Sequence, residues 1–275
     1  MKNYYKNVIR VLTVLTISVV VMPLLALPMR VAALTAPTVV DYNQSTWTDA
    51  TAYAVPEVTG SVTWQAGDVV VVLGGASNGH GAFNTPTATG LSFSLITSVG
   101  VEDPNQVPFQ AWSATAASGG SGAVSATRVG AIDFGVQAVG LSVWVYRGAG
   151  GIGNSNTLSA SSATTISLTR GTDNSAVVVG MGDWNAFNDT AVTGSPSAGS
   201  TQRLAINKVN DYTAFEYDWT DQGTAGTTNY GIANFGATPL MSGVVVEIQG
   251  SGSSGTARVI RLLGGMRLLG GVRLL

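Results

Sequence analysis

The chain has 275 residues, of which 10% are charged and 35 are glycine, and it contains no cysteine. The lack of cysteine excludes disulfides, thiolate nucleophiles and cysteine-ligated metals. Low charge, abundant glycine and 45% hydrophobic residues are typical of β-sheets joined by many turns, and they exclude a disordered chain. The length suits one large all-β domain or two small ones.

The net charge of −2 conceals a strong segregation of charge along the chain. Residues 1–33 and residues 251–275 each contain four basic residues and no acid. The other five basic residues and all 15 acids lie in 34–250, which therefore carries a net charge of −10. Because an acidic body repels phosphate backbones, we expect no nucleic-acid partner.

Residues 1–33 have the layout of a secretory signal peptide. A basic start precedes an apolar run over 11–27, and small residues at 31–33 offer a cleavage site. An uncleaved membrane anchor is the alternative, although Pro23 and Pro28 argue against it. Either alternative places the bulk of the protein outside the cytoplasm, so we predict a secreted or cell-surface protein.

From residue 35 onward, short β-rich runs recur between clusters of Gly, Asn, Asp, Ser and Pro. We predict eleven strands, at 60–65, 68–74, 90–100, 109–116, 122–130, 138–148, 164–170, 174–182, 201–206, 213–219 and 242–250. The run 69–73 is apolar on both faces, which predicts a central strand, and the last run is predicted to close the fold by pairing near its start. No stretch shows a helical period.

These strands predict an all-β fold, an antiparallel β-sandwich of the jelly-roll type over 34–250, with an apolar N-terminal helix and a short C-terminal tail. Two smaller immunoglobulin-like domains with a break near 149–162 are the alternative. In 213–219, aromatic residues alternate with Glu216 and Asp218. This alternation predicts a strand with one buried face and one solvated face.

Four segments together resemble a β-sandwich module of secreted bacterial surface proteins and of phage tail or virion structural proteins. They are "VTWQAGDVVVV" (62–72), "LSVWVYRGAGG" (141–151), "NSAVVVGMGDW" (174–184) and "GVVVEIQ" (243–249). The resemblance covers about 55–250 and implies a jelly-roll module with a structural or adhesive role and no catalytic residues. The signal peptide favours the secreted surface proteins, because virion proteins assemble inside the cell.

Catalytic candidates are few. His80, the single histidine, lies in a glycine-rich stretch without a nucleophile-elbow sequence, which favours an ordinary loop residue. Glu216 and Asp218 lie two positions apart on one strand, a spacing that could serve a jelly-roll glycoside hydrolase or simply form a solvated strand face. Lys208, the only lysine after the leader, could crosslink to an asparagine, although low overall charge explains its isolation equally well.

Two loop sites are candidates for binding. Oxygen ligands at Asp183, Asn185 and Asp189 could hold a structural Ca²⁺, as could those of "VEDPN" (101–105), although Asp and Asn are also common turn residues. Of six tryptophans, Trp184, followed by Phe187, is the best candidate for stacking on a sugar. We expect the other five tryptophans to be core residues.

The C-terminus repeats one Arg-Leu-Leu unit every six residues, after a flexible Gly/Ser linker at 251–257. The repeat occupies 258–275 and places equivalent residues on the same side of an extended chain. Its predicted anchoring residues are Arg261, Arg267, Arg273, Leu262, Leu268 and Leu274. An apolar, cationic segment tethered to an acidic body predicts retention or sorting at the cell envelope, or assembly with a neighbouring copy.

We therefore predict an exported, non-enzymatic surface protein that needs no cofactor apart from the candidate structural Ca²⁺. Its expected partners are the cell envelope or a surface polymer, with carbohydrate and a second copy of the chain as alternatives. A carbohydrate-binding module and a jelly-roll glycoside hydrolase are the alternative functions.

Overall fold

The computed structural model describes residues 34–50, 56–76, 81–101, 107–129, 137–183, 195–208, 212–234 and 240–252. The predicted signal peptide and the repeat tail lie outside these ranges. Within them every helix or strand is a β-strand, and every pairing is antiparallel. The prediction of an antiparallel all-β fold is confirmed, and the compact unit that holds these strands begins at Leu34.

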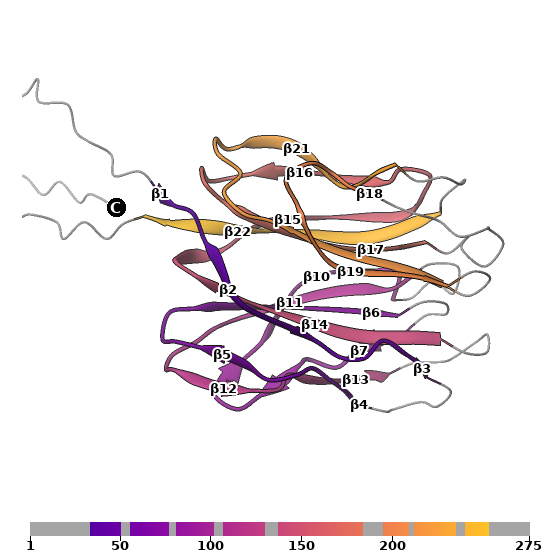
Figure 1. The fold of residues 1–275 in the computed structure, drawn as a ribbon, viewed down its shortest axis with the longest axis horizontal. Coiled ribbons are helices and arrows are strands. Elements are labelled where there is room, and N and C mark those ends of the chain that lie inside the picture. The colour runs from indigo at the N-terminus through magenta and orange to yellow at the C-terminus, as the bar shows by residue number, and fades with distance from the viewer. Residues whose placement is uncertain are drawn as a thin grey trace, which may run out of the picture. The chain divides into compact units, whose positions relative to one another are not determined.

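The N-terminal half of the body builds the first large sheet (Figure 1), in the order β10-β11-β6-β14-β2, with β3 also pairing with β14. Its strands are β2 (Thr38–Gln44), β3 (Thr48–Ala50), β6 (Val69–Ala76), β10 (Ser94–Val99), β11 (Phe109–Thr115) and β14 (Gln137–Arg147). The strand β6 is central and buried along its whole length, as its uninterrupted apolar sequence predicts.

The C-terminal half builds the second large sheet, in the order β22-β17-β20-β19, and β15 and β1 also pair with β22. Its strands are β1 (Leu34–Thr35), β15 (Ala149–Ser161), β17 (Ala176–Asp183), β19 (Thr201–Lys208), β20 (Tyr212–Trp219) and β22 (Met241–Gly252). The pairing of β1 with β22 confirms that the last strand closes the fold near its start.

Smaller sheets cover the outer face of each large sheet. Over the first lie β4 (Pro56–Val58), β5 (Val62–Trp64), β7 (Ala82–Phe83), β8 (Thr87–Ala88), β9 (Leu91–Ser92), β12 (Gly120–Gly122) and β13 (Ser125–Val129). Over the second lie β16 (Thr165–Arg170), β18 (Ser195–Pro196) and β21 (Gly226–Asn234). Apolar side chains fill both outer spaces, so each half of the body has a core of its own.

The two large sheets have the same strand order relative to the chain. In each half the central strand, β6 or β17, has the last strand of that half on one side. On its other side lies the second strand of a hairpin, β11 after β10 or β20 after β19. The first strand of each half, β2 or β15, flanks the last. The body is therefore two copies of one topology, spanning about residues 38–147 and 149–252.

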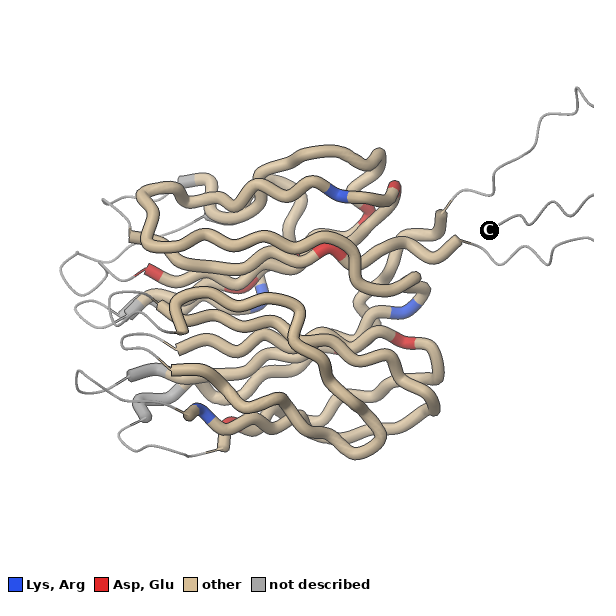
Figure 2. Tube along the Cα trace, turned by 180° about the vertical axis from the view of Figure 1, so that it is seen from behind, with Lys and Arg blue, Asp and Glu red and all other residues tan. Residues whose placement is uncertain are grey.

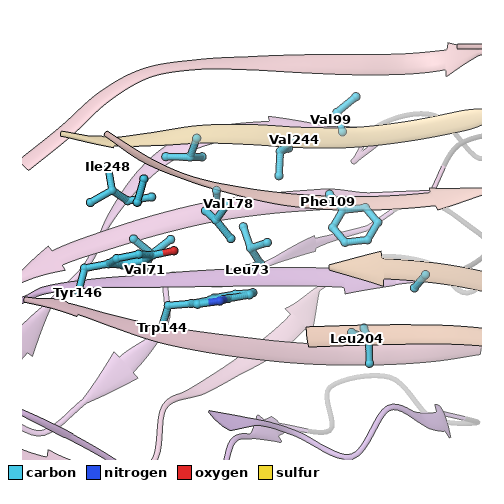
Figure 3. Close-up of a cluster of buried hydrophobic side chains, with 14 of the residues drawn as sticks. Val71, Leu73, Val99, Phe109, Trp144, Tyr146, Val178, Leu204, Val244 and Ile248 are labelled. Atoms are coloured by element: carbon cyan, nitrogen blue, oxygen red, sulfur yellow. The ribbon is translucent and has the colours of Figure 1, made fainter. Parts of the chain in front are cut away.

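The two halves pack through the inner faces of their large sheets. Phe109, Trp144 and Tyr146 from the first sheet meet Val178 and Val244 from the second in a third, central core (Figure 3). The strand β10 lies over β15, and β11 lies over β22. Equivalent strands of the two large sheets therefore follow one another in opposite directions across the contact. A two-fold axis between β6 and β17 would relate the two sheets in this way.

The body has two poles. At one pole, which we call the terminal pole, Leu34 pairs with Gly252, and Figure 1 shows β1 beside the end of β22. The turn between the halves, at Gly148, lies at the same pole, because the Ser251 N–H donates to its carbonyl. At the opposite pole Asp183, the last residue of β17, pairs with Met241, the first residue of β22.

The predicted strands are confirmed in position, because each of the eleven ranges overlaps a strand of the structure. Residues 149–162, the range of the alternative break, do not form a linker, because Ala149–Ser161 are the strand β15, in which Gly150, Gly153 and Asn154 lie at bulges against β22. The two halves meet just before this strand, at Gly148. Glycine-rich bulged strands lack the alternation that identifies a strand in a sequence. The predicted linker also starts two residues too early, because β22 continues to Gly252.

Candidate functional site

The strand β20 presents two acidic side chains to the interior of the body. Phe215, Tyr217 and Trp219 face the outer core beneath β16 and β21. Glu216 and Asp218 point the other way, into the space between the two large sheets, and are 0% and 1% exposed. The predicted solvated face is therefore wrong, because the first large sheet covers the side of β20 that alternation alone would leave wet.

Asp218 is held by partners from both halves. The Trp144 indole Nε1 donates a hydrogen bond of 3.1 Å to Asp218 Oδ2, and Arg203 forms a short ion pair with the same oxygen. The Arg203 guanidinium also lies 5.0 Å above the ring of Tyr42, at cation–π distance. The charge of Asp218 is thus compensated inside the interface between the halves.

Glu216 lacks such compensation. Neither of its carboxyl oxygens has a hydrogen-bond partner among the described residues. Burial raises the pKa of Glu216 to about 8, and the Ser142 hydroxyl, which lies near the carboxyl group but outside hydrogen-bonding geometry, opposes this only in part. At neutral pH its carboxyl is therefore mostly protonated and uncharged. Burial, reinforced by Glu216, likewise raises the pKa of Tyr42, and burial with Asp218 raises that of Tyr146.

The other half of the body has no acid at the equivalent position. The central strands β6 and β17 each have eight residues, so aligning their ends makes Leu73 equivalent to Gly180. Gly180 pairs with Glu216, and Leu73 pairs with Ala111, which is a fully buried core residue. The same topology therefore folds with an apolar residue at this place, and the acid is specific to the C-terminal half.

A groove lies beside β19, the edge strand next to the strand that carries Glu216. It has a volume of about 410 Å³ and runs between the edges of the two large sheets, lined by Gln44, Ser45, Thr46, Trp47, Leu204 and Ile206. Gln44 is paired with Ser142 on β14, and Leu204 is paired with Glu216 on β20. The groove thus lies over the buried hydroxyl and carboxyl, with a single layer of edge-strand residues between.

Of the three predicted calcium ligands, the structure describes only Asp183. Asp183 ends β17, is 2% exposed, and accepts a 2.8 Å hydrogen bond from the Leu240 N–H through Oδ1. Asn185 and Asp189 lie outside the described residues. In the described ranges no three His, Asp or Glu side chains gather as a metal site would require.

The prediction that five tryptophans belong to the core is confirmed, because Trp47, Trp64, Trp112, Trp144 and Trp219 are all buried. The candidate sugar-stacking pair, Trp184 and Phe187, and the histidine His80 lie outside the described residues. So do the predicted anchoring residues of the tail, Arg261, Arg267, Arg273, Leu262, Leu268 and Leu274. The backbone of Lys208, on β19, pairs with Tyr212. Lys208 lies four positions after Leu204, the residue of β19 that pairs with Glu216.

A further buried carboxylate, that of Glu247, was not predicted. Glu247, on β22, is 0% exposed and accepts hydrogen bonds from the backbone N–H groups of Asn154, Gly171 and Thr172 at 3.0–3.1 Å, and from the Ser175 hydroxyl at 2.7 Å. Burial raises its pKa, but the hydrogen bonds outweigh burial and leave the pKa below its ordinary value. Glu247 therefore fastens the turn after β16 to the second large sheet.

No protein-family model matches this sequence, and comparisons with curated proteins and with solved structures find no match. Of the residues that the structure describes, none belongs to a helix that is long and apolar enough to cross a bilayer. The role of the buried residues around Glu216 and Asp218 is therefore inferred from their geometry.

Proposed function

We propose that this is an exported, non-enzymatic protein of the cell surface, structural or adhesive in role, which is retained or assembled through its C-terminal tail. Leu34, the first described residue, follows the predicted cleavage site directly. The tail begins after Gly252, the last residue of β22.

The observation that carries this proposal is the polarity of the body. The N-terminal strand β1 and the final residues of β22 lie side by side at the terminal pole. Six strand ends lie at the other pole: Ala50, Ala76, Gln137, Asp183, Tyr212 and Met241. A body attached by its tail at one pole would present the opposite pole to its surroundings.

The poorly charged exterior also supports a surface role. Eight charged residues are buried: Glu57, Asp68, Arg128, Arg170, Asp183, Glu216, Asp218 and Glu247. Charged positions are also few along the described chain (Figure 2). Interface cores are depleted in charged residues, so a surface of this kind suits close packing with neighbouring molecules or polymers.

We further propose that each half is a jelly roll, of the kind found in the β-sandwich modules that the sequence resembles. In the N-terminal half the first strand, β2, pairs with the last, β14, and β5 pairs with β12, so the second pairing is nested inside the first. The C-terminal half repeats this scheme with β15, β22, β16 and β21. Nested pairing of first with last strands is the organisation of a jelly roll.

Cell fractionation tests the retention by the tail. The chain is produced in full and with residues 253–275 deleted, which spares Gly252 and its pairing with Leu34. We expect the full chain in the envelope fraction and the truncated chain in the medium. A matched variant with Arg261, Arg267 and Arg273 changed to Gln separates charge from apolar contact. Equal release of the full and truncated chains would remove the proposal.

Carbohydrate binding is a second candidate function, supported by the position of Asp183. This residue ends β17 at the pole remote from the tail, and Trp184 follows it directly. Glycoside hydrolysis is less well supported, because the paired acids Glu216 and Asp218 are buried between the halves. A pair of hydrolytic carboxyl groups has to face a substrate cleft.

A further inference from the structure

Glu216 takes no part in the proposed function, yet its surroundings are unusual. It lies at the contact between the two halves, fully buried and without a hydrogen-bond partner among the described residues. The titratable and charged groups around it are Tyr42 on β2, Tyr146 on β14, Arg203 on β19 and Asp218 on β20. Arg203 is committed to Asp218, so it does not neutralise Glu216.

The fold itself does not require a carboxyl group here. Ala111 occupies the equivalent place in the N-terminal half and packs in the same central core. A buried acid is tolerated only while it is neutral or paired, because an isolated charge in an apolar interior is strongly unfavourable. Because Glu216 is unpaired within the described chain, its carboxyl group is tolerated at this contact only in the neutral, protonated form.

We propose that Glu216 is a proton-operated latch that holds the two halves of the body together. With the proton bound, the neutral carboxyl group packs in the central core and the large sheets stay closed. Loss of the proton leaves an unpaired negative charge beside Asp218 and favours separation of the sheets. Opening begins along β2 and β19, where the groove over Leu204 already brings solvent within one strand of Glu216.

The direction of the pH effect follows from proton linkage. The closed state holds its proton up to a pKa of about 8, whereas a solvated glutamate has an ordinary pKa of 4.5. Between these values the closed state binds one proton that the open state lacks. The equilibrium constant for opening should therefore rise about tenfold per pH unit from about 4.5 to 8, and level off above that. The latch is tightest in mildly acidic surroundings.

Amide hydrogen exchange of the full chain between pH 5 and pH 9, corrected for the intrinsic exchange rate, tests the latch. We expect opening of β14 and β20 to rise about tenfold per pH unit, while β5 and β16 in the outer sheets change much less. Glu216→Gln should remove this slope. Glu216→Ala, which copies the residue of the other half, is the second variant. Glu57→Gln, at a buried acid away from the contact, is the matched control and should keep the slope.

Three results would overturn the proposal. The first is the same slope in the chain with Glu216→Gln or Glu216→Ala. The second is a slope that is equal in the outer sheets, which would indicate global unfolding and no separation of the halves. The third is exchange in the unaltered chain that does not depend on pH. None of these outcomes bears on retention by the tail, because the latch rests only on contacts within the body.

Discussion

Replacing Glu247 by glutamine tests how far one carboxylate holds the C-terminal half together. The change keeps the size of the side chain but removes its charge and turns one acceptor oxygen into an amide donor. That donor would face N–H groups of Asn154, Gly171 and Thr172, which at present donate to the carboxylate. The variant therefore places donors against donors in a fully buried position.

The expected cost can be worked from these contacts. Hydrogen bonds to a charged group contribute about 1.5–3 kcal/mol each, and a buried donor without a partner costs about 1–3 kcal/mol. Because the contacts share one carboxylate group and are not additive, we expect Glu247→Gln to lower the free energy of unfolding by about 2–4 kcal/mol. For a body of this size the melting temperature should fall by about 5–15 °C.

Urea denaturation followed by tryptophan fluorescence measures the change, with Glu57→Gln as the matched control. Burial raises the pKa of Glu57, so neutralising that residue should leave stability nearly unchanged or improve it. The pKa of Glu247 is lowered, so its contribution is present above pH 4.5 and is lost as the pH falls through the folded-state pKa. The variant should lack this acid-range loss. A change below about 0.5 kcal/mol at pH 7 would refute the reasoning.

Two further substitutions probe the contact between the halves. Arg203→Leu leaves Asp218 buried without its cation, so unfolding in urea should become easier by about 3–5 kcal/mol; a change near zero would mean that the ion pair is already solvated. Gly140→Ala places a methyl group against the indole of Trp47 and should cost about 1–3 kcal/mol in the same assay. Gly122→Ala is the control, because the nearest atom to its new methyl group would be 3.8 Å away. Equal stability of the two alanine variants would show that Trp47 moves aside freely.

The alternation in 213–219 shows how far local sequence reasoning reaches. It separates the aromatic side chains from Glu216 and Asp218 correctly, because successive residues of a strand point to opposite faces. It then assigns the acids to solvent, which is wrong. The residues that bury them, Trp144 and Tyr42, lie more than 70 positions earlier in the chain. The sequence of one strand does not indicate whether a second large sheet will cover its polar side.

The hydrogen-bond donors around Glu247 could not be predicted from the sequence for a related reason. An acid within the apolar run "VVVEIQ" could equally end a solvent-facing strand, and its donors come from β15 and from the turn after β16. The only local sign is that the residues on both sides are strongly apolar. The glycine at 153, where a side chain would collide with the carboxylate, acquires its meaning only from the fold.

Local sequence determined the β class, the eleven strands, the central position of β6 and the closing role of β22, because side-chain period and turn residues act within a few positions of the chain. It also determined the contrast between an acidic body and cationic ends. The tertiary structure alone decided that two copies of one topology stack face to face, and that the acids of β20 lie in their contact. Those outcomes depend on burial between segments far apart in sequence, where the loss of water reverses the preference of a charged group.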